Sequence, residues 1–168
     1  DPRDPRILSS PFDGSGLPNQ AMTWVENGEL RNLNYSRYWA DKQGVQPTGF
    51  PSGWAMDGGD STIEDMIRST ERGLLLTRFW YIRGVDPRTI LYTGLTRDST
   101  FLVENGEISH PVKNFRWNES PIFMLNNIEM MGEPVRISAS ESSGLTNSVV
   151  VPPLKVRDFT FTSLSDAI

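Results

Sequence analysis

Two short segments repeat one pattern, in which apolar strand-forming residues flank an Asn-Gly pair between two glutamates. They are residues 25–30 and residues 103–108. Asn and Gly tolerate the positive φ angles of a type I′ turn, so each segment predicts a β-hairpin. The repeat has two interpretations, an old duplication or a favourable turn that arose twice, because two copies are too few for a solenoid array.

Helical signals stand at two places in the first half of the chain. Residues 37–43 lie between Ser36, a favourable N-cap, and Gly44, a favourable C-terminal stop. A second helix is expected to begin at Ser61, because Glu64 follows three residues later and the two residue types form a capping box.

Residues 74–83 form the longest run of strand-forming side chains. Both alternating faces are largely apolar, so we expect a central strand that is covered on both sides. Arg78 and Arg83 lie among aromatic residues, an arrangement that also suits stacking on nucleic acid bases. The net charge of −5 and the lack of other basic clusters favour a buried strand over nucleic acid binding.

Residues 45–59 are rich in Gly and Pro and predict a loop. This segment also carries Phe50 and Trp54. Aromatic side chains in such a loop either line a binding cleft or fold back onto the core, and both interpretations stay open.

Strands separated by turn residues, with two or three short helices between them, predict an α+β fold. The third helix is expected over residues 121–128, after Ser120. The fold is expected to be β-rich. Its sheet is expected to be mostly antiparallel and built from hairpins, and either open or barrel-like. Residues 1–20, rich in Pro, Asp and Gly, predict a linker or lead-in from a missing N-terminal region, and residues 21–168 predict one domain.

Composition narrows the chemistry that this chain can perform by itself. The chain of 168 residues has no Cys and one His, His110, so it has no disulfide, no thiolate nucleophile and no two-His metal site. No Ser stands in a Gly-x-Ser-x-Gly elbow, and no apolar run is long enough to cross a membrane. We therefore expect no catalytic residue and no metal ligand set within the chain.

Several segments resemble, in order and spacing, the C-terminal region of the TldD/PmbA peptidase family, also known as modulators of DNA gyrase. The resemblance spans residues 12–161. The segments that carry it are Val-Glu-Asn-Gly-Glu-Leu at 25–30, Tyr-Ser-Arg-Tyr at 35–38, Pro-Thr-Gly at 47–49, Gly-Asp-Ser-Thr at 59–62, Glu-Arg-Gly-Leu at 71–74, Val-Glu-Asn-Gly-Glu-Ile at 103–108 and Leu-Lys-Val at 154–156.

The resemblance implies a cytoplasmic zinc peptidase that acts on unfolded peptides and forms homo- or heterodimers of TldD-type and PmbA-type chains. Only TldD-type chains carry the metal motif His-Glu-x-x-x-His, upstream of the region that this chain resembles. Their third ligand, a Cys, corresponds to the stretch 135–141, which has no Cys here. The resemblance thus implies zinc only for the full-length protein, and favours a PmbA-like partner without metal or a divergent member.

On this basis the chain is expected to form the peptide cleft and subunit interface of such a peptidase. The candidate substrate-binding residues are Arg37, Tyr38, Thr48 and Gly49, which fall in the best-matching block and the loop after it. Packing and turn geometry are the alternative role for each of them. The alternative function is a non-enzymatic scaffold whose hairpins and aromatic loop bind another protein.

Overall fold

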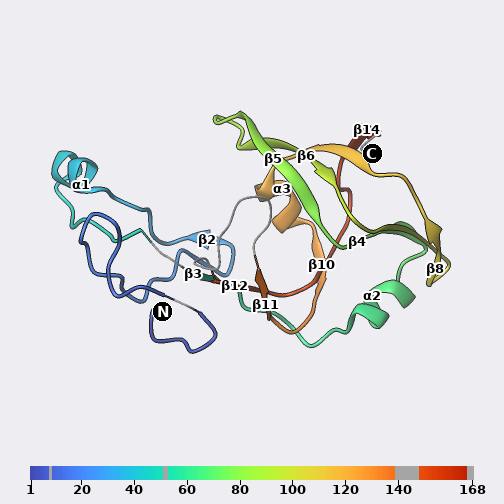
Figure 1. Cartoon of the computed structure of the whole chain (residues 1–168), viewed down its shortest axis with the longest axis horizontal. Helices are drawn as coiled ribbons and strands as arrows, with labels where there is room; N and C mark the ends of the chain where they lie inside the picture. Colours follow the sequence, from blue (N-terminus) through green and yellow to red (C-terminus); the bar gives the residue numbers. More distant parts are fainter. Residues whose placement is uncertain (8, 51–52, 139–147, 166–168) are drawn as a thin grey trace. The chain divides into compact units, whose positions relative to one another are not determined.

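The computed structural model describes residues 1–7, 9–50, 53–138 and 148–165, and the chain divides into two compact units. Unit 1 comprises Asp1–Asp57 with Val135–Val151, and unit 2 comprises Gly58–Pro134 with Pro152–Ile168. Figure 1 shows the elements of both units in sequence colours. Ile7 and Leu17, which belong to the expected lead-in, are buried in unit 1. A domain boundary at residue 21 stays a prediction.

Unit 1 holds a three-stranded sheet whose strands come from distant parts of the chain. β11 (Val135–Ser138) pairs antiparallel with β12 (Ser148–Val151), and β12 pairs parallel with β3 (Gly53–Ala55). The sheet order β11-β12-β3 makes β3 an edge strand (Figure 1). The prediction of a loop over residues 45–59 is therefore wrong at β3. A strand of three residues is too short to give a sequence pattern and depends on a partner far along the chain.

The two Asn-Gly segments form hairpins, as predicted. β1 (Val25–Glu26) pairs with β2 (Glu29–Leu30) in unit 1, and β7 (Thr100–Glu104) pairs with β8 (Glu107–Pro111) in unit 2. The φ angles are +52° and +80° at Asn27 and Gly28, and +52° and +81° at Asn105 and Gly106. Positive φ at both central residues is the requirement that the sequence pattern met.

The predicted helix after Ser36 is confirmed as α1 (Arg37–Gln43). The Ser36 hydroxyl accepts a hydrogen bond from the backbone N–H of Trp39, and Gly44 has a left-handed φ of +65°. Ala40 is the buried residue of this helix in unit 1.

The second helix, α2 (Ile63–Arg68), begins one residue later than predicted. Its N-cap is Thr62, and Thr62 and Asp65 form the capping box that was assigned to Ser61 and Glu64. Ser61 is held elsewhere, since its backbone N–H donates to the carbonyl of Met131 at 3.1 Å. The third helix, α3 (Pro121–Asn126), ends earlier than predicted, and the Ser120 side chain makes no capping hydrogen bond.

The prediction of one central strand over residues 74–83 is wrong. The chain forms β4 (Arg72–Leu76) and β5 (Phe79–Asp86), which lie at the edges of two different sheets. The break at Thr77 mirrors a break between their partner strands, where Asp98 has a left-handed φ of +65°. At the junction the Thr77 N–H and hydroxyl both donate to the carbonyl of Ser99, and the Arg97 N–H donates to the carbonyl of Arg78, so backbone contacts continue between the two sheets.

Unit 2 contains three open sheets in the described part of the chain, with orders β14-β9-β6-β5, β4-β7-β8 and β10-β13. The remaining strands are β6 (Leu91–Thr96), β9 (Phe115–Glu119), β10 (Ile128–Met131), β13 (Leu154–Val156) and β14 (Phe161–Leu164). Phe79, Trp117 and Phe159 pack together with ring centroids 5.1–5.6 Å apart. In the described ranges of both units, strand-rich, mostly antiparallel sheets with three helices confirm the predicted α+β class.

Candidate functional site

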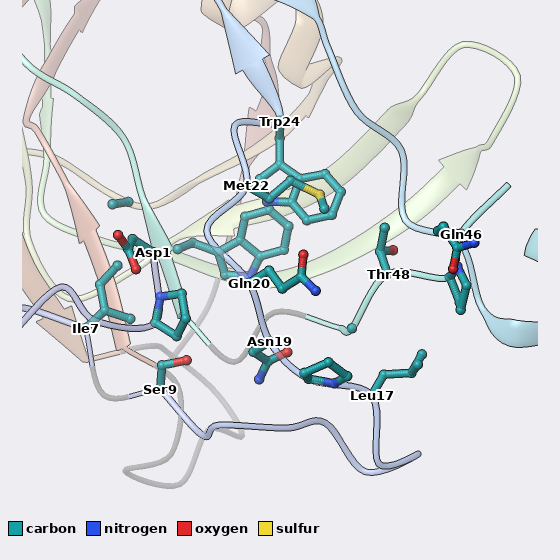
Figure 2. Close-up of a pocket in the computed structure, with 17 residues that line it drawn as sticks. Asp1, Ile7, Ser9, Leu17, Asn19, Gln20, Met22, Trp24, Gln46 and Thr48 are labelled. Carbon is teal, nitrogen blue, oxygen red and sulfur yellow. The ribbon is translucent and has the colours of Figure 1, made fainter.

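Unit 1 contains a cavity of about 490 Å³ that is the candidate site. Pockets that hold small ligands or side chains usually have volumes of about 300–1,000 Å³. The lining residues come from three stretches, namely the N-terminal residues, the segment before β1, and the segment from residue 46 through β3. They are Asp1, Pro2, Ile7, Ser9, Leu17, Pro18, Asn19, Gln20, Met22, Trp24, Gln46, Pro47, Thr48, Gly49, Gly53, Trp54 and Ala55 (Figure 2).

All three residues of β3 line the cavity. Consecutive side chains of a strand point to opposite faces, yet Gly53, Trp54 and Ala55 all line the cavity. β12 pairs with one edge of β3, so the strand borders the cavity with a face or with its outer, second edge.

The backbone of β3 presents hydrogen-bonding groups at this outer edge. The N–H of Met56 donates to the carbonyl of Val150 on β12. Backbone groups alternate in direction along a strand, so Trp54 also faces β12, whereas the N–H and C=O of Gly53 and Ala55 face away from it. An edge of this kind can accept an extended peptide as an additional strand.

Two tryptophans contribute the aromatic part of the cavity wall. The ring centroids of Trp24 and Trp54 are 5.6 Å apart, with an angle of 38° between the ring planes. Trp54 lines the cavity and is 43% exposed, and a role of this residue in binding stays a prediction. Phe50 is 64% exposed and is not among the lining residues.

Thr48 and Gly49, two of the four predicted site residues, line the cavity. The Thr48 hydroxyl accepts hydrogen bonds from the backbone N–H of Tyr35 at 2.8 Å and from the Asn34 amide at 3.0 Å. Gly49 lies against Pro18 and Asn19, where an added Cβ would be 2.8 Å from the Asn19 side-chain oxygen. These contacts hold the segment in place, and a direct role in substrate binding stays a prediction for both residues.

Asp13 fixes the end of the same segment. One carboxylate oxygen accepts the backbone N–H of Phe50 at 3.0 Å, and the other accepts the N–H groups of Ser15 and Leu17 at 2.8 and 2.9 Å. The hydrogen bond from Phe50 is the main reason that the pKa of Asp13 lies well below its usual value, followed by that from the Ser15 side chain. Asp13 therefore connects the wall at residues 48–49 to the turn that precedes Leu17.

Arg37 and Tyr38, the other two predicted site residues, lie on α1 and do not line the cavity. The Arg37 guanidinium donates to the carbonyl of Ser15 at 3.3 Å. Tyr38 is 63% exposed, and its ring meets that of Trp39 edge-on at 5.3 Å. The structure thus brings Thr48 and Gly49 together and leaves the other pair on the neighbouring helix.

Sequence reasoning did not identify Trp24, Gln20 or the β3 edge as parts of the site. Trp24 directly precedes the first hairpin, and no local signal shows that it meets Trp54. The edge arises only when β12 pairs with β3, which is a long-range event.

The described residues do not fit a zinc site. No three His, Cys, Asp or Glu side chains gather within the part of the chain that the structure describes. The stretch that corresponds, by resemblance, to the family's Cys ligand is 135–141, of which β11 covers residues 135–138 and the rest lies outside the described residues. Within β11, Val135, Arg136 and Ile137 offer no thiolate, imidazole or carboxylate. We derive no catalytic step through a metal held by these residues. Nor is any helix among the described residues both long and apolar enough to cross a membrane.

Comparison with known proteins gives consistent relatives. The chain is 28% identical over 153 residues to the metalloprotease PmbA of Escherichia coli O157:H7, and 30% identical over 158 residues to the PmbA homolog of Haemophilus influenzae. These alignments cover 89% and 90% of this chain but 33% of each relative, so the chain spans about a third of their length. A Thermotoga maritima protein, described as a candidate modulator of a DNA gyrase, shares the fold with a TM-score of 0.75 and 24% identity. That match covers 91% of this chain and 35% of the other.

The family model described as the PmbA/TldA metallopeptidase C-terminal domain matches residues 1–163. This match covers nearly the whole chain and agrees with the named relatives and with the shared fold. The chain therefore belongs to the PmbA/TldD metallopeptidase family, as a C-terminal domain of it.

Proposed function

We propose that this domain binds an extended, unfolded peptide at the outer edge of β3 and presents it to a metallopeptidase centre. The observation that carries the proposal is the cavity bordered by all three residues of that edge strand. Backbone pairing at an edge reads no particular sequence, which suits a peptidase of broad range. Thr48 and Gly49 form the wall beside the bound peptide, whereas Arg37 and Tyr38 contact it outside the cavity.

The metal and the groups that activate water come from outside this chain. The stretch 135–141 has no Cys, so the rest of the full-length protein or a partner subunit of the same family supplies the zinc site. The protein works as a homo- or heterodimer in the cytoplasm, as the family resemblance implies.

The subunit interface is the second role of the domain in this proposal. On α3, Ile122, Phe123 and Leu125 are 50%, 64% and 45% exposed. Apolar side chains grouped on one short helix are typical of a surface that another protein covers.

The proposal is tested on the full-length protein purified together with any copurifying partner. Zinc is measured by mass spectrometry, and hydrolysis of an unstructured peptide is followed with and without a chelator. We expect zinc in the complex and chelator-sensitive hydrolysis. Zinc in neither subunit, with no hydrolysis, would leave a non-enzymatic scaffold as the function.

Pairing at the β3 edge has its own test, a series of peptides that are N-methylated at one position each. An added strand directs every second N–H toward its partner, so we expect binding to be lost at alternate positions of the series. Uniform tolerance of N-methylation would contradict edge pairing.

A further inference from the structure

We infer that the cavity beside β3 selects a large uncharged side chain, above all an aromatic one, of the peptide bound there. This inference rests on the proposed peptide-binding function and adds a side-chain preference to it. An extended peptide directs successive side chains to opposite faces, so one of them can enter the cavity while its neighbours point away.

The wall chemistry favours an aromatic occupant. The tilted rings of Trp24 and Trp54 form part of the cavity wall. Met22 adds a polarisable thioether to the same wall. Aromatic rings gain from tilted or edge-on contacts with other rings and from contacts with sulfur. Ile7 and Leu17, which are 7% and 8% exposed, extend the apolar surface.

Apart from Asp1, the polar side chains of the lining are uncharged, which does not favour a charged occupant. Gln20, Gln46 and Thr48 carry no charge, and Asp1 is the single ionisable residue among the lining residues. The Asp1 carboxylate is already paired with Arg3 at 3.1 Å. A Lys, Asp or Glu side chain would lose water in this cavity without gaining a free counter-charge, which disfavours its entry.

The volume also fits. A cavity of about 490 Å³ lies within the range that accepts small ligands, so a Phe, Tyr or Trp side chain can enter with room to spare. The hydrogen bonds at Thr48 hold one wall before the ligand arrives, which reduces the ordering needed on binding.

The test measures binding of a peptide series to the full-length protein by calorimetry. The peptides share one uncharged, unstructured sequence and differ at a single position, which is Phe, Leu, Glu or Lys. We expect the Phe peptide to bind about tenfold or more tightly than the Glu and Lys peptides, with Leu between them. Equal affinity across the series overturns the inference.

Variants that fill the cavity then locate the preference. Gln20→Phe and Gln46→Phe add bulk from two different segments, and neither glutamine takes part in a hydrogen bond in the described structure. Gln43→Phe makes the same change at the exposed end of α1, away from the cavity. We expect either cavity variant to reduce the preference for Phe to about twofold or less and the control to keep it.

Two filling variants guard against misfolding of one of them, and circular dichroism confirms the fold of each. A preference that survives in both folded cavity variants overturns the inference. The inference and the proposed function can fail separately. Zinc-dependent hydrolysis without any side-chain preference contradicts the inference alone. A Phe preference in a protein that never hydrolyses peptides removes the peptidase function and keeps the pocket.

Discussion

At position 49 the backbone lies so close to another segment that a side chain has no room. An added Cβ would be 2.8 Å from both the Asn19 side-chain oxygen and the Pro18 carbonyl oxygen. We expect Gly49→Ala to destabilise the protein by about 1–3 kcal/mol, as overpacking does elsewhere, and to weaken peptide binding at the cavity. Chemical denaturation of the full-length protein measures the change.

Gly14→Ala is the matched control for this substitution. A Cβ at Gly14 meets no atom within 4 Å, so stability should change by less than about 0.5 kcal/mol. Equal effects of the two substitutions would show that the close approach at Gly49 has no energetic consequence.

The hydrogen bonds of Asp13 predict that the stability of the protein depends on pH in the acidic range. Hydrogen bonds, first of all from the Phe50 N–H, lower the pKa of this carboxyl in the folded protein. A lowered folded pKa stabilises the protein at pH values above the unfolded pKa of about 3.9, and this contribution is lost as the pH falls below it. We expect Asp13→Asn to unfold at a lower temperature than the wild type at pH 7, and the difference to shrink toward pH 3. A difference that stays constant with pH would contradict this role.

At the start of α2, two neighbouring hydroxyl residues are expected to differ in how much they stabilise the helix. The Thr62 hydroxyl accepts the N–H of Asp65 at 3.0 Å, whereas Ser61 precedes the cap. We expect Thr62→Ala to cost about 1 kcal/mol of unfolding free energy and Ser61→Ala less than about 0.5 kcal/mol. The reverse order, measured by urea denaturation, would restore the assignment made from sequence.

Two tryptophans of the four-stranded sheet are expected to differ in how much each stabilises the protein. Trp117 is 6% exposed within the cluster of Phe79 and Phe159, so Trp117→Ala should destabilise by about 3–5 kcal/mol. Trp80 lies on the edge strand β5 with the Arg78 guanidinium 4.5 Å from its ring centre, and Trp80→Ala should cost about 1–2 kcal/mol. Equal losses in a denaturation experiment would contradict the edge position of β5.

Elements that depend on neighbouring residues were predictable, and elements that depend on distant ones were not. The Asn-Gly hairpins and α1 follow from turn and cap chemistry within a few residues. The break at Thr77 and the short strand β3 depend on partners elsewhere in the chain. An apolar run such as residues 74–83 predicts strand formation, but it does not show where the chain passes from one sheet to another.

The candidate site was predictable to the same extent. The family resemblance selected Thr48 and Gly49, which line the cavity, together with Arg37 and Tyr38, which do not. A matching sequence segment shows which residues a family has in common. It does not show which of these residues line the same cavity. The meeting of Trp24 with Trp54 depends on the folded arrangement of unit 1.

At the scale of the whole molecule, unit 1 is built from two distant segments of the chain, and its second segment comes only at Val135–Val151. β3 gains its partner β12 only after the chain has passed through residues 58–134 of unit 2, because β12 begins at Ser148. We expect the fragment 1–57 alone to lack the fold that it has in unit 1, with a poorly dispersed NMR spectrum. A dispersed spectrum with protected amides at β3 would show that the fragment needs no later strand.

The two Glu-Asn-Gly-Glu hairpins differ in how closely their turns contact the rest of the protein. At the second, the N–H groups of Asn105 and Gly106 donate to the carbonyls of Glu71 and Thr70. At the first, a Cβ on Gly28 would meet no atom within 4 Å. Insertions and length drift are therefore expected to accumulate at residues 27–28 among descendants of this gene, while residues 105–106 keep a fixed length. A surface loop for displaying an epitope or a reporter belongs at the first turn for the same reason.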